Sequence, residues 1–271
     1  CHYCVIGRPV LCENKNGNLG VMLDGTTRMT ARGHAIYHYG YVSTFATHSV
    51  MPESSAIKID DDMPLDLAAL IGCSVTTGVG AVLNTAQVEA GASLAVFGTG
   101  GIGLNAIQGG VLASASPIIA VDVRDNKLDY AMSLGATHAV DASKEDPVEA
   151  IKQITRRGAD YTVVAVGHVG AMRQAWDALA PGGTCVIIGV GETGAQLPLD
   201  AGRIPGTERV LRGSSYGSAR VRDDFPRFVN LYKAGKLKLD QLVTQRYPLE
   251  DVNEAFRALA AGEVARGILV F

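Results

Sequence analysis

The stretch 94–108 constrains the fold of this chain more than any other. A short apolar run at 93–97, bounded by glycines, predicts a buried β-strand. Gly98, Gly100 and Gly103 follow with G-x-G-x-x-G spacing, and an apolar helical pattern starts at once. In a strand–turn–helix unit these glycines allow the sharp turn, the approach of backbone to a pyrophosphate, and close packing of helix on strand. Because the helix N-terminus presents unpaired N–H groups to phosphates, we expect a dinucleotide site here.

The glycine pattern needs supporting context, because the chain contains 32 glycines. A second apolar run, 118–122, ends in Asp122, which lies 19 positions after Gly103. A carboxylate at this place bonds the adenosine ribose and would repel a 2′-phosphate, so it indicates NAD rather than NADP. Arg124 lies two residues further on and could weaken that preference. The alternative is an aspartate that only ends a strand.

Strands and helices alternate along the middle of the chain. Apolar runs at 118–122, 137–140, 160–166 and 184–189 predict strands, separated by helices of about ten residues. This order predicts a doubly wound α/β fold with a parallel sheet and right-handed crossovers. Val166 and Val190 follow two of the strands, at the edge where such folds bind ligands. Cys185 lies inside a strand, so we expect it in the core.

The flanking segments follow other patterns. Residues 13–60 predict short strands and turns, including a strand at 56–59, and a helix starts at 65–70. His34, His38 and His48 have no partner at ligand spacing, so we expect solvated loop histidines. From about residue 216 we expect two helices, at 225–234 and 249–261, around a strand at 242–247.

Composition limits the class of protein. A length of 271 residues fits one large or two modest domains, and a net charge of −3 gives no indication of nucleic acid or an anionic membrane as partner. We find no run of 18 apolar residues without charge and no signal peptide, so we expect a soluble, cytoplasmic protein with no membrane partner. Five cysteines, an odd number, favour a reduced compartment and metal ligation over disulfides.

Three of the cysteines open the chain. Cys1, Cys4 and Cys12 have C-x2-C-x7-C spacing among turn formers, which is typical of a zinc site. Three ligands do not close a structural site, and His2 lies inside the first turn, where it is poorly placed to be the fourth. We therefore expect a fourth cysteine just upstream, in a longer chain. The alternative is three reduced surface cysteines that hold no metal.

These features together resemble the zinc-dependent medium-chain alcohol dehydrogenases. The matching tracts are 1–13, 71–80, the glycine loop with Val121-Asp122, 134–141 and 265–271, so the resemblance covers essentially the whole chain. Within the family the chain looks most similar to the bacterial branch of nicotinoprotein and thiol-adduct formaldehyde dehydrogenases. The resemblance implies a Rossmann domain at 76–215. It also implies an incomplete, discontinuous GroES-like β-rich catalytic domain, made of 1–75 and 216–271.

The resemblance also implies site residues. Cys73, by its residue type alone a buried inert thiol, matches a ligand of the catalytic zinc, and Thr77 lies against the nicotinamide; Cys1, Cys4 and Cys12 match the structural zinc site. The implied cofactor-binding residues are Gly98, Gly100, Gly101, Ile102, Gly103, Asp122, Lys127, Val166, Val190 and Arg266. For Arg266 the alternative is an exposed charge. The family's other catalytic zinc ligands and its proton relay come from about 100 residues that would precede this chain, so we expect the chain as given to be inactive.

We therefore expect an NAD-linked zinc alcohol dehydrogenase that acts on an alcohol or aldehyde as a homodimer or homotetramer. In that family zinc acts as a Lewis acid on the substrate oxygen. A thiol-adduct formaldehyde dehydrogenase of the same family is one alternative. A zinc-independent quinone reductase would share the glycine loop but lack the cysteine tract, which argues against it. A non-catalytic NAD-binding module would bind the cofactor without turnover.

Overall fold

The structure is a computed structural model that describes residues 1–14, 17 and 20–271. Residues 15, 16, 18 and 19 of the expected strand-and-turn segment lie outside the described residues. The chain forms two compact units: a sheet unit, 61–242, and a terminal unit made of 1–60 together with 243–271. The domain borders expected from the sequence, at 75 and 216, fall inside the sheet unit. The reason is that the helices on both sides of those borders pack into this unit.

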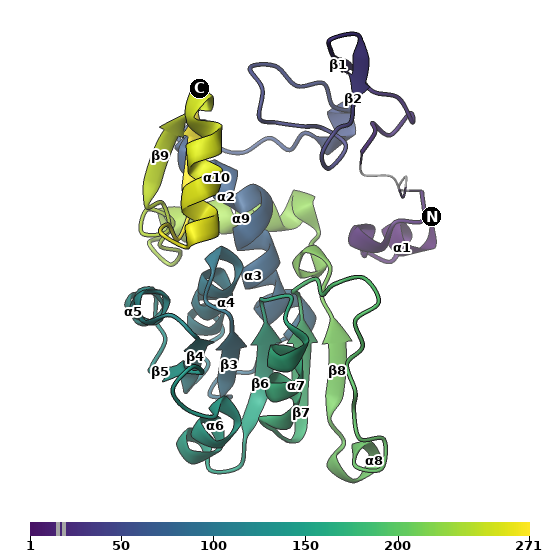
Figure 1. Cartoon of the computed structure of the whole chain (residues 1–271). Coiled ribbons are helices and arrows are strands. Elements are labelled where there is room, and N and C mark those ends of the chain that lie inside the picture. Colours follow the sequence, from purple (N-terminus) through teal and green to yellow (C-terminus); the bar gives the residue numbers. More distant parts are fainter. Residues whose placement is uncertain (15–16, 18–19) are drawn as a thin grey trace. The chain divides into compact units, whose positions relative to one another are not determined.

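A six-stranded parallel sheet with the order β5-β4-β3-β6-β7-β8 organises the sheet unit (Figure 1). The strand order reverses between β3 and β6, which confirms the doubly wound α/β fold. The sequence patterns located five of the strands to within a few residues but did not indicate β8, a short strand at the edge. The strands are β3 (Leu94–Phe97), β4 (Ile118–Asp122), β5 (His138–Asp141), β6 (Ala159–Val164), β7 (Leu179–Ile187) and β8 (Val210–Gly213).

Helices cover both faces of this sheet, so its central strands are apolar on both sides. Ala95 and Phe97 of β3 lie in one core cluster with residues of α6 and α7. Leu94 faces the other way, where a Cβ added to Gly110 of α4 would lie 2.7 Å from the Leu94 side chain. The helices are α4 (Gly101–Leu112), α5 (Asp125–Ser133), α6 (Pro147–Thr155), α7 (Val169–Asp177), α8 (Ile204–Thr207) and α9 (Val221–Lys233).

One longer helix runs from Leu65 to Ala86 in the sheet unit. It is made of α2 (Leu65–Leu70), α3 (Thr76–Gly80) and two π-helical segments, η3 (Ile71–Val75) and η4 (Ala81–Ala86). By length and composition it could cross a membrane, so the expectation that no such apolar run exists was wrong. However, 67% of its most apolar stretch is buried inside the structure. It is therefore the core helix of the sheet unit.

The terminal unit consists of short elements. Near the N-terminus are α1 (His2–Val5), η1 (Pro9–Leu11) and η2 (Glu53–Ser55), with a hairpin of β1 (Met29–Ala31) and β2 (His34–Ile36). The C-terminal part pairs β9 (Gln245–Pro248) in parallel with β10 (Gly267–Val270), connected by η6 (Leu249–Asp251) and α10 (Val252–Ala261). The strand expected at 56–59 does not form.

His38 differs from the other two loop histidines. Its ring is buried, whereas His34 and His48 are exposed as expected. The Nε2 atom accepts a hydrogen bond from the backbone N–H of Arg28 at 3.2 Å, and Nδ1 lies 3.3 Å from the carbonyl of Val42. These contacts fit the tautomer with the proton on Nδ1. The expectation of a solvated His38 was therefore wrong, because its ring links two loop segments whose backbone groups have no strand partners.

Candidate cofactor site and metal site

The turn from β3 into α4 has the backbone that the glycine spacing predicts. Gly98 adopts a left-handed φ of +85°, and its N–H donates to the carbonyl of Val121 at 2.8 Å, which ties the loop to β4. A Cβ added to Gly103 would lie 1.8 Å from the carbonyl oxygen of Gly98. Only glycine permits this approach, so the start of α4 is held directly against the end of β3.

Gly100 serves a different purpose. It caps the N-terminus of α4 with no side-chain cap, and a Cβ added there would meet nothing within 4 Å. The space beside Gly100 is thus open, and the first N–H groups of the 12-residue α4 have no partner inside the helix. Gly101 and Ile102, in the first turn, are half-buried. This arrangement suits a phosphate group, which would lie against backbone donors at the positive end of the helix dipole.

Asp122 lies at the end of β4, and its carboxylate already has partners within the loop. Oδ2 accepts hydrogen bonds from the backbone N–H and the hydroxyl of Thr99, at 2.7 and 3.0 Å, and Oδ1 accepts from the N–H of Val123 at 2.8 Å. The residue is buried, with 9% of its surface exposed. Since Oδ1 accepts only one of these bonds and can accept a second, Asp122 can both fix the loop and bind a ribose hydroxyl.

The other expected cofactor residues occupy three places. Val166 lies just after β6 and contacts the loop, because a Cβ added to Gly98 would lie 3.0 Å from its Cβ. Val190, after β7, is 91% exposed, and its carbonyl approaches Gly167 so closely that a Cβ there would lie 2.1 Å away. Lys127 is half-buried in α5. The structure therefore brings Val166 and Val190 together at the carboxyl edge of the sheet. Arg266 belongs to the terminal unit.

Cys73 and Thr77 lie on successive segments of the core helix. Cys73, in η3, is exposed and is not the buried inert thiol that its residue type alone suggests, whereas Thr77, in α3, is buried. The helix is held against α4, since a Cβ added to Gly78 would lie 2.3 Å from the carbonyl of Ile102. The two candidate residues are therefore carried on a rigid support beside the glycine loop.

The phenol of Tyr216, in η5 (Tyr216–Ser218), reaches this part of the core helix. Its hydroxyl donates to the carbonyl of Gly72. Burial, and to a smaller extent the nearby Cys73, raises the pKa of Tyr216 to about 12. No sequence pattern indicated this contact, because the two residues are 144 positions apart. Thr99 was also missed, although its place inside the glycine loop and opposite an aspartate could have indicated it.

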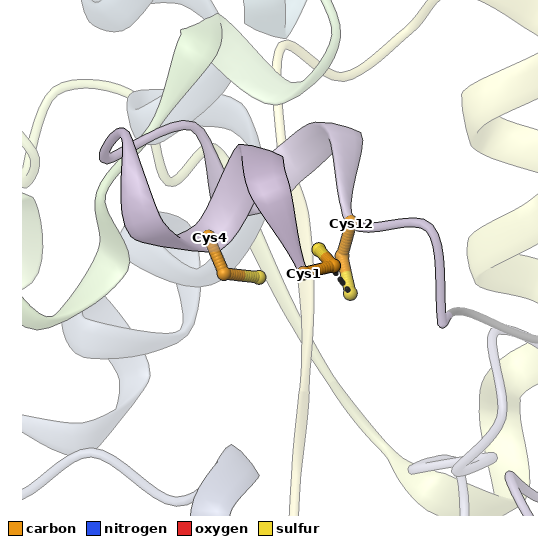
Figure 2. A group of neighbouring side chains, drawn as sticks. All are labelled: Cys1, Cys4 and Cys12. Atoms are coloured by element: carbon orange, nitrogen blue, oxygen red, sulfur yellow. Dashed lines mark hydrogen bonds between the residues drawn. The ribbon is translucent and has the colours of Figure 1, made fainter.

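The N-terminal cysteines converge in the terminal unit. Figure 2 shows Cys1, Cys4 and Cys12 with their sulfur atoms grouped together, on α1 and beside η1. All three sulfurs lie within 4.8 Å of one another, and those of Cys1 and Cys12 are 3.9 Å apart. Tetrahedral zinc with bonds of about 2.3 Å places its sulfur ligands roughly 3.8 Å apart. The three thiols therefore fit a zinc ion, for which they would supply three of the four ligands.

The turns around these cysteines explain why they meet. Gly7 adopts a left-handed φ of +75°, and the N–H of Arg8 donates to the carbonyl of Tyr3 at 2.8 Å, which brings the chain back towards Cys12. His2 lies outside the cluster, with its ring against that of Tyr3 at 5.4 Å. Within the described residues, the three cysteines are the one group of three or more histidine, cysteine, aspartate or glutamate side chains close enough to share a metal ion.

The remaining cysteines stand apart from any such group. Cys185 is fully buried in β7, as expected for a core residue, and burial raises its pKa to about 11. Among the described residues, Cys73 belongs to no group of three metal donors. A catalytic zinc needs three protein ligands, so the donors described here do not by themselves make such a site, and no reaction step through a metal is derived from them.

Comparison with known proteins agrees with this geometry. A family model described as zinc-binding dehydrogenase matches residues 101–234. The alcohol dehydrogenase class-3 of Cereibacter sphaeroides is 41% identical over 283 residues, with 100% of this chain and 75% of that protein covered. The S-(hydroxymethyl)glutathione dehydrogenase of Paracoccus denitrificans is 39% identical over 282 residues, again with 100% and 75% covered.

Solved structures give the same result. An alcohol dehydrogenase zinc-binding domain protein from Burkholderia ambifaria matches with a TM-score of 0.93 and 34% identity, over 99% of this chain and 74% of that one. Benzyl alcohol dehydrogenase from Acinetobacter calcoaceticus matches with a TM-score of 0.90 and 30% identity, over the same shares. The chain thus belongs to the zinc-dependent medium-chain alcohol dehydrogenases, the oxidoreductases that transfer hydride between an alcohol or aldehyde and NAD.

Proposed function

We propose that this chain binds NAD at the loop 98–103 with Asp122, and that Cys73 and Thr77 face the reacting end of that cofactor. The observation that carries the proposal is the junction of β3 and β4. The glycine loop there leaves open space beside Gly100 and the N-terminus of α4, while Asp122 lies at the end of the neighbouring strand. Pyrophosphate and adenosine ribose fit these two places.

Different residues of the dinucleotide site bind different parts of NAD. Backbone N–H groups of Gly101 and Ile102 bind the pyrophosphate, and Lys127 bonds the adenosine ribose beside Asp122. Val166 and Val190 border the nicotinamide ring and exclude water from one side of it. The chemistry supplied by bound NAD is acceptance of a hydride at the nicotinamide. Orientation of the ring is what this chain's own residues contribute.

We further propose that Cys1, Cys4 and Cys12 hold a structural zinc and that Cys73 is one ligand of the catalytic zinc. The grouped sulfur atoms support the first assignment. The second rests on the match of 71–80 to the family and on the exposure of Cys73 beside the glycine loop. Assembly as a homodimer or homotetramer and a cytoplasmic location complete the proposal.

The substrate class separates two candidates. Relatives named S-(hydroxymethyl)glutathione dehydrogenase favour a thiol adduct of formaldehyde, whereas the solved benzyl alcohol dehydrogenase favours a simple aromatic alcohol. Assays of NADH formation with S-(hydroxymethyl)glutathione, benzyl alcohol and ethanol, on zinc-loaded protein that carries a full set of catalytic zinc ligands, distinguish them. We expect an alcohol oxidised at the expense of NAD. The thiol-adduct candidate requires a kcat/KM for the glutathione adduct at least about tenfold above that for both alcohols, a difference worth about 1.4 kcal/mol in the transition state.

The cofactor and metal assignments are tested on the 271-residue chain. Titration calorimetry should show NAD binding, and elemental analysis should show about one zinc per chain that is lost in Cys12→Ser. Cys185→Ser is the matched control, because that thiol lies in the core, and it should keep the metal. Absence of NAD binding would overturn the cofactor assignment, and zinc retained in Cys12→Ser would overturn the metal assignment.

A further inference from the structure

The turn after β8 has an unusual backbone. Tyr216, Gly217 and Ser218 have φ values of +51°, +64° and +50°, so three successive residues are left-handed. This conformation is unfavourable for tyrosine and serine, and it persists only where surrounding contacts impose it.

Contacts with the core helix impose this backbone. Gly217 lies against α3, because a Cβ added to it would be 2.1 Å from the carbonyl of Thr76 and 2.9 Å from the Cα of Gly80. The side-chain amide of Asn84 donates to the carbonyl of Gly217 at 3.3 Å. The Thr85 hydroxyl lies 2.8 and 2.7 Å from the hydroxyls of Ser214 and Ser218. The turn is thus fixed on the helix on both sides of Tyr216.

The phenol extends from this turn to the π-helical segment η3 of the core helix. In the π-helical segment η3 the backbone pairs i→i+5 in place of i→i+4, and side-chain hydroxyls add hydrogen bonds to carbonyls at its start. The hydroxyl of Ser74 donates to the carbonyl of Leu70 at 3.3 Å, and that of Thr76 donates to the carbonyl of Ile71 at 2.6 Å. The next carbonyl, that of Gly72, accepts from Tyr216. The first two donors lie four and five residues from their acceptors, whereas Tyr216 lies 144 residues from Gly72 in the sequence.

The peptide that Tyr216 holds is the one that leads into Cys73. Gly72 has no side chain, and a Cβ there would meet nothing within 4 Å, so no neighbouring element crowds this position. Cys73 itself is exposed. The hydrogen bond from Tyr216 is therefore the contact in the described structure that restrains the Gly72–Cys73 peptide from the distant turn.

We propose that Tyr216 is a positioning residue, whose hydroxyl fixes the Gly72–Cys73 peptide and thereby sets the placement of the Cys73 thiol. The inference rests on the proposed function only in the assignment of Cys73 to the substrate site. A turn on the cofactor edge of the sheet would then control the geometry of a ligand that lies on a separate helix.

The test is the reactivity of Cys73 in Tyr216→Phe, which keeps the ring and removes the hydroxyl. The rate of alkylation by iodoacetamide is followed at each cysteine by peptide-resolved mass spectrometry on the full chain. We expect the rate at Cys73 to rise about threefold to tenfold, since one local hydrogen bond is lost, and amide exchange at 72–75 to become faster. Thermal stability and the rates at the other cysteines should stay unchanged.

Tyr232→Phe is the matched control, because the Tyr232 hydroxyl lies 3.5 Å from Asp240 in the same unit, so this variant removes a phenol hydroxyl with a different partner. It should leave the rate at Cys73 unchanged. An unchanged rate in Tyr216→Phe would overturn the inference, and so would failure of that variant to fold, since the hydroxyl would then act on global stability. NAD titration of both variants tests the proposed function independently. Absence of NAD binding would contradict the proposed function but would not change what the alkylation rates say about Tyr216.

Discussion

Asp122 combines two roles that a substitution can separate. Its carboxylate holds the Thr99 N–H and hydroxyl, and its charge is expected to exclude the 2′-phosphate of NADP. Asp122→Asn removes the charge but keeps an acceptor oxygen for Thr99, whereas Asp122→Gly removes both. We expect Asn to weaken NAD binding about tenfold and to reduce the preference for NAD over NADP. Gly should do both and also lower the melting temperature.

Calorimetric titration with each dinucleotide, together with thermal unfolding, measures these effects. An Asp122→Asn variant that still rejects NADP as strongly as the original chain would show that the charge does not set the preference. The same result would indicate that Asp122 acts only as a structural end to β4.

The buried thiol of Cys185 should make the free energy of unfolding depend on pH in the alkaline range. Burial raises the pKa of this thiol from 9.0 to about 11, and the side chain is fully buried. Below pH 9 the thiol is protonated in both states; between pH 9 and 11 the unfolded chain loses the proton first, so stability falls as pH rises. The loss is at most about 3 kcal/mol over this range. Cys185→Ala should remove this component of the slope, although its stability at pH 7 is lower.

Urea unfolding at pH 8, 9, 10 and 11 for both proteins measures the difference in slope. Other groups that titrate in this range cancel in the comparison, because the two chains share them. Parallel curves for the two proteins would contradict the prediction. They would show that the buried thiol keeps an ordinary pKa.

At the scale of elements, substitutions at the junction of β3 and α4 should separate effects on stability from effects on NAD binding. A Cβ at Gly103 would lie 1.8 Å from the backbone oxygen of Gly98, which cannot move without displacing the strand. Gly103→Ala should therefore cost about 3 kcal/mol or more and abolish NAD binding. A Cβ at Gly100 meets nothing, and its φ of −69° suits alanine. Gly100→Ala should change stability by about 1 kcal/mol or less but weaken NAD binding, since its methyl group occupies the space expected for the pyrophosphate.

Thermal unfolding and NAD titration of both variants provide the comparison. Normal NAD affinity in Gly100→Ala would place the phosphates elsewhere. Equal stability of the two variants would contradict the packing argument at Gly103.

The same elements show how far sequence patterns extend. The turn between strand and helix at the glycine loop, the place of Asp122 at the end of β4 and five strands were predicted correctly, because each depends on residues close together in the chain and on continuous apolar runs. The strand β8 was not, since its exposed edge position leaves no such run: all four of its residues are exposed. The contact of Tyr216 with Gly72 and the buried ring of His38 depend on tertiary packing. The spacing of residues along the chain does not predict such packing.

At the scale of the whole molecule, apolar burial is distributed unevenly. The largest fully buried side chains, among them Phe97, Phe228 and Leu104, all lie in the sheet unit. Among the described residues, the buried apolar side chains of the terminal unit are Val21, Met22, Ala258 and Ile268. A unit with so small a core gains little from burial and depends on other constraints. A zinc ion bound by three cysteines of the terminal unit would be such a constraint.

This distribution predicts two unfolding transitions that respond to different ligands. The terminal unit should unfold at the lower temperature, and removal of zinc by a chelator should lower that transition further. NAD at a hundred times its Kd should add about 2.7 kcal/mol to the free energy of unfolding of the sheet unit, which builds its candidate site. Only the higher transition temperature should therefore rise. Scanning calorimetry with chelator or NAD measures both shifts, and hydrogen exchange assigns each transition to its residues. A single transition that both ligands move would contradict the prediction, since the two units would then unfold as one cooperative body.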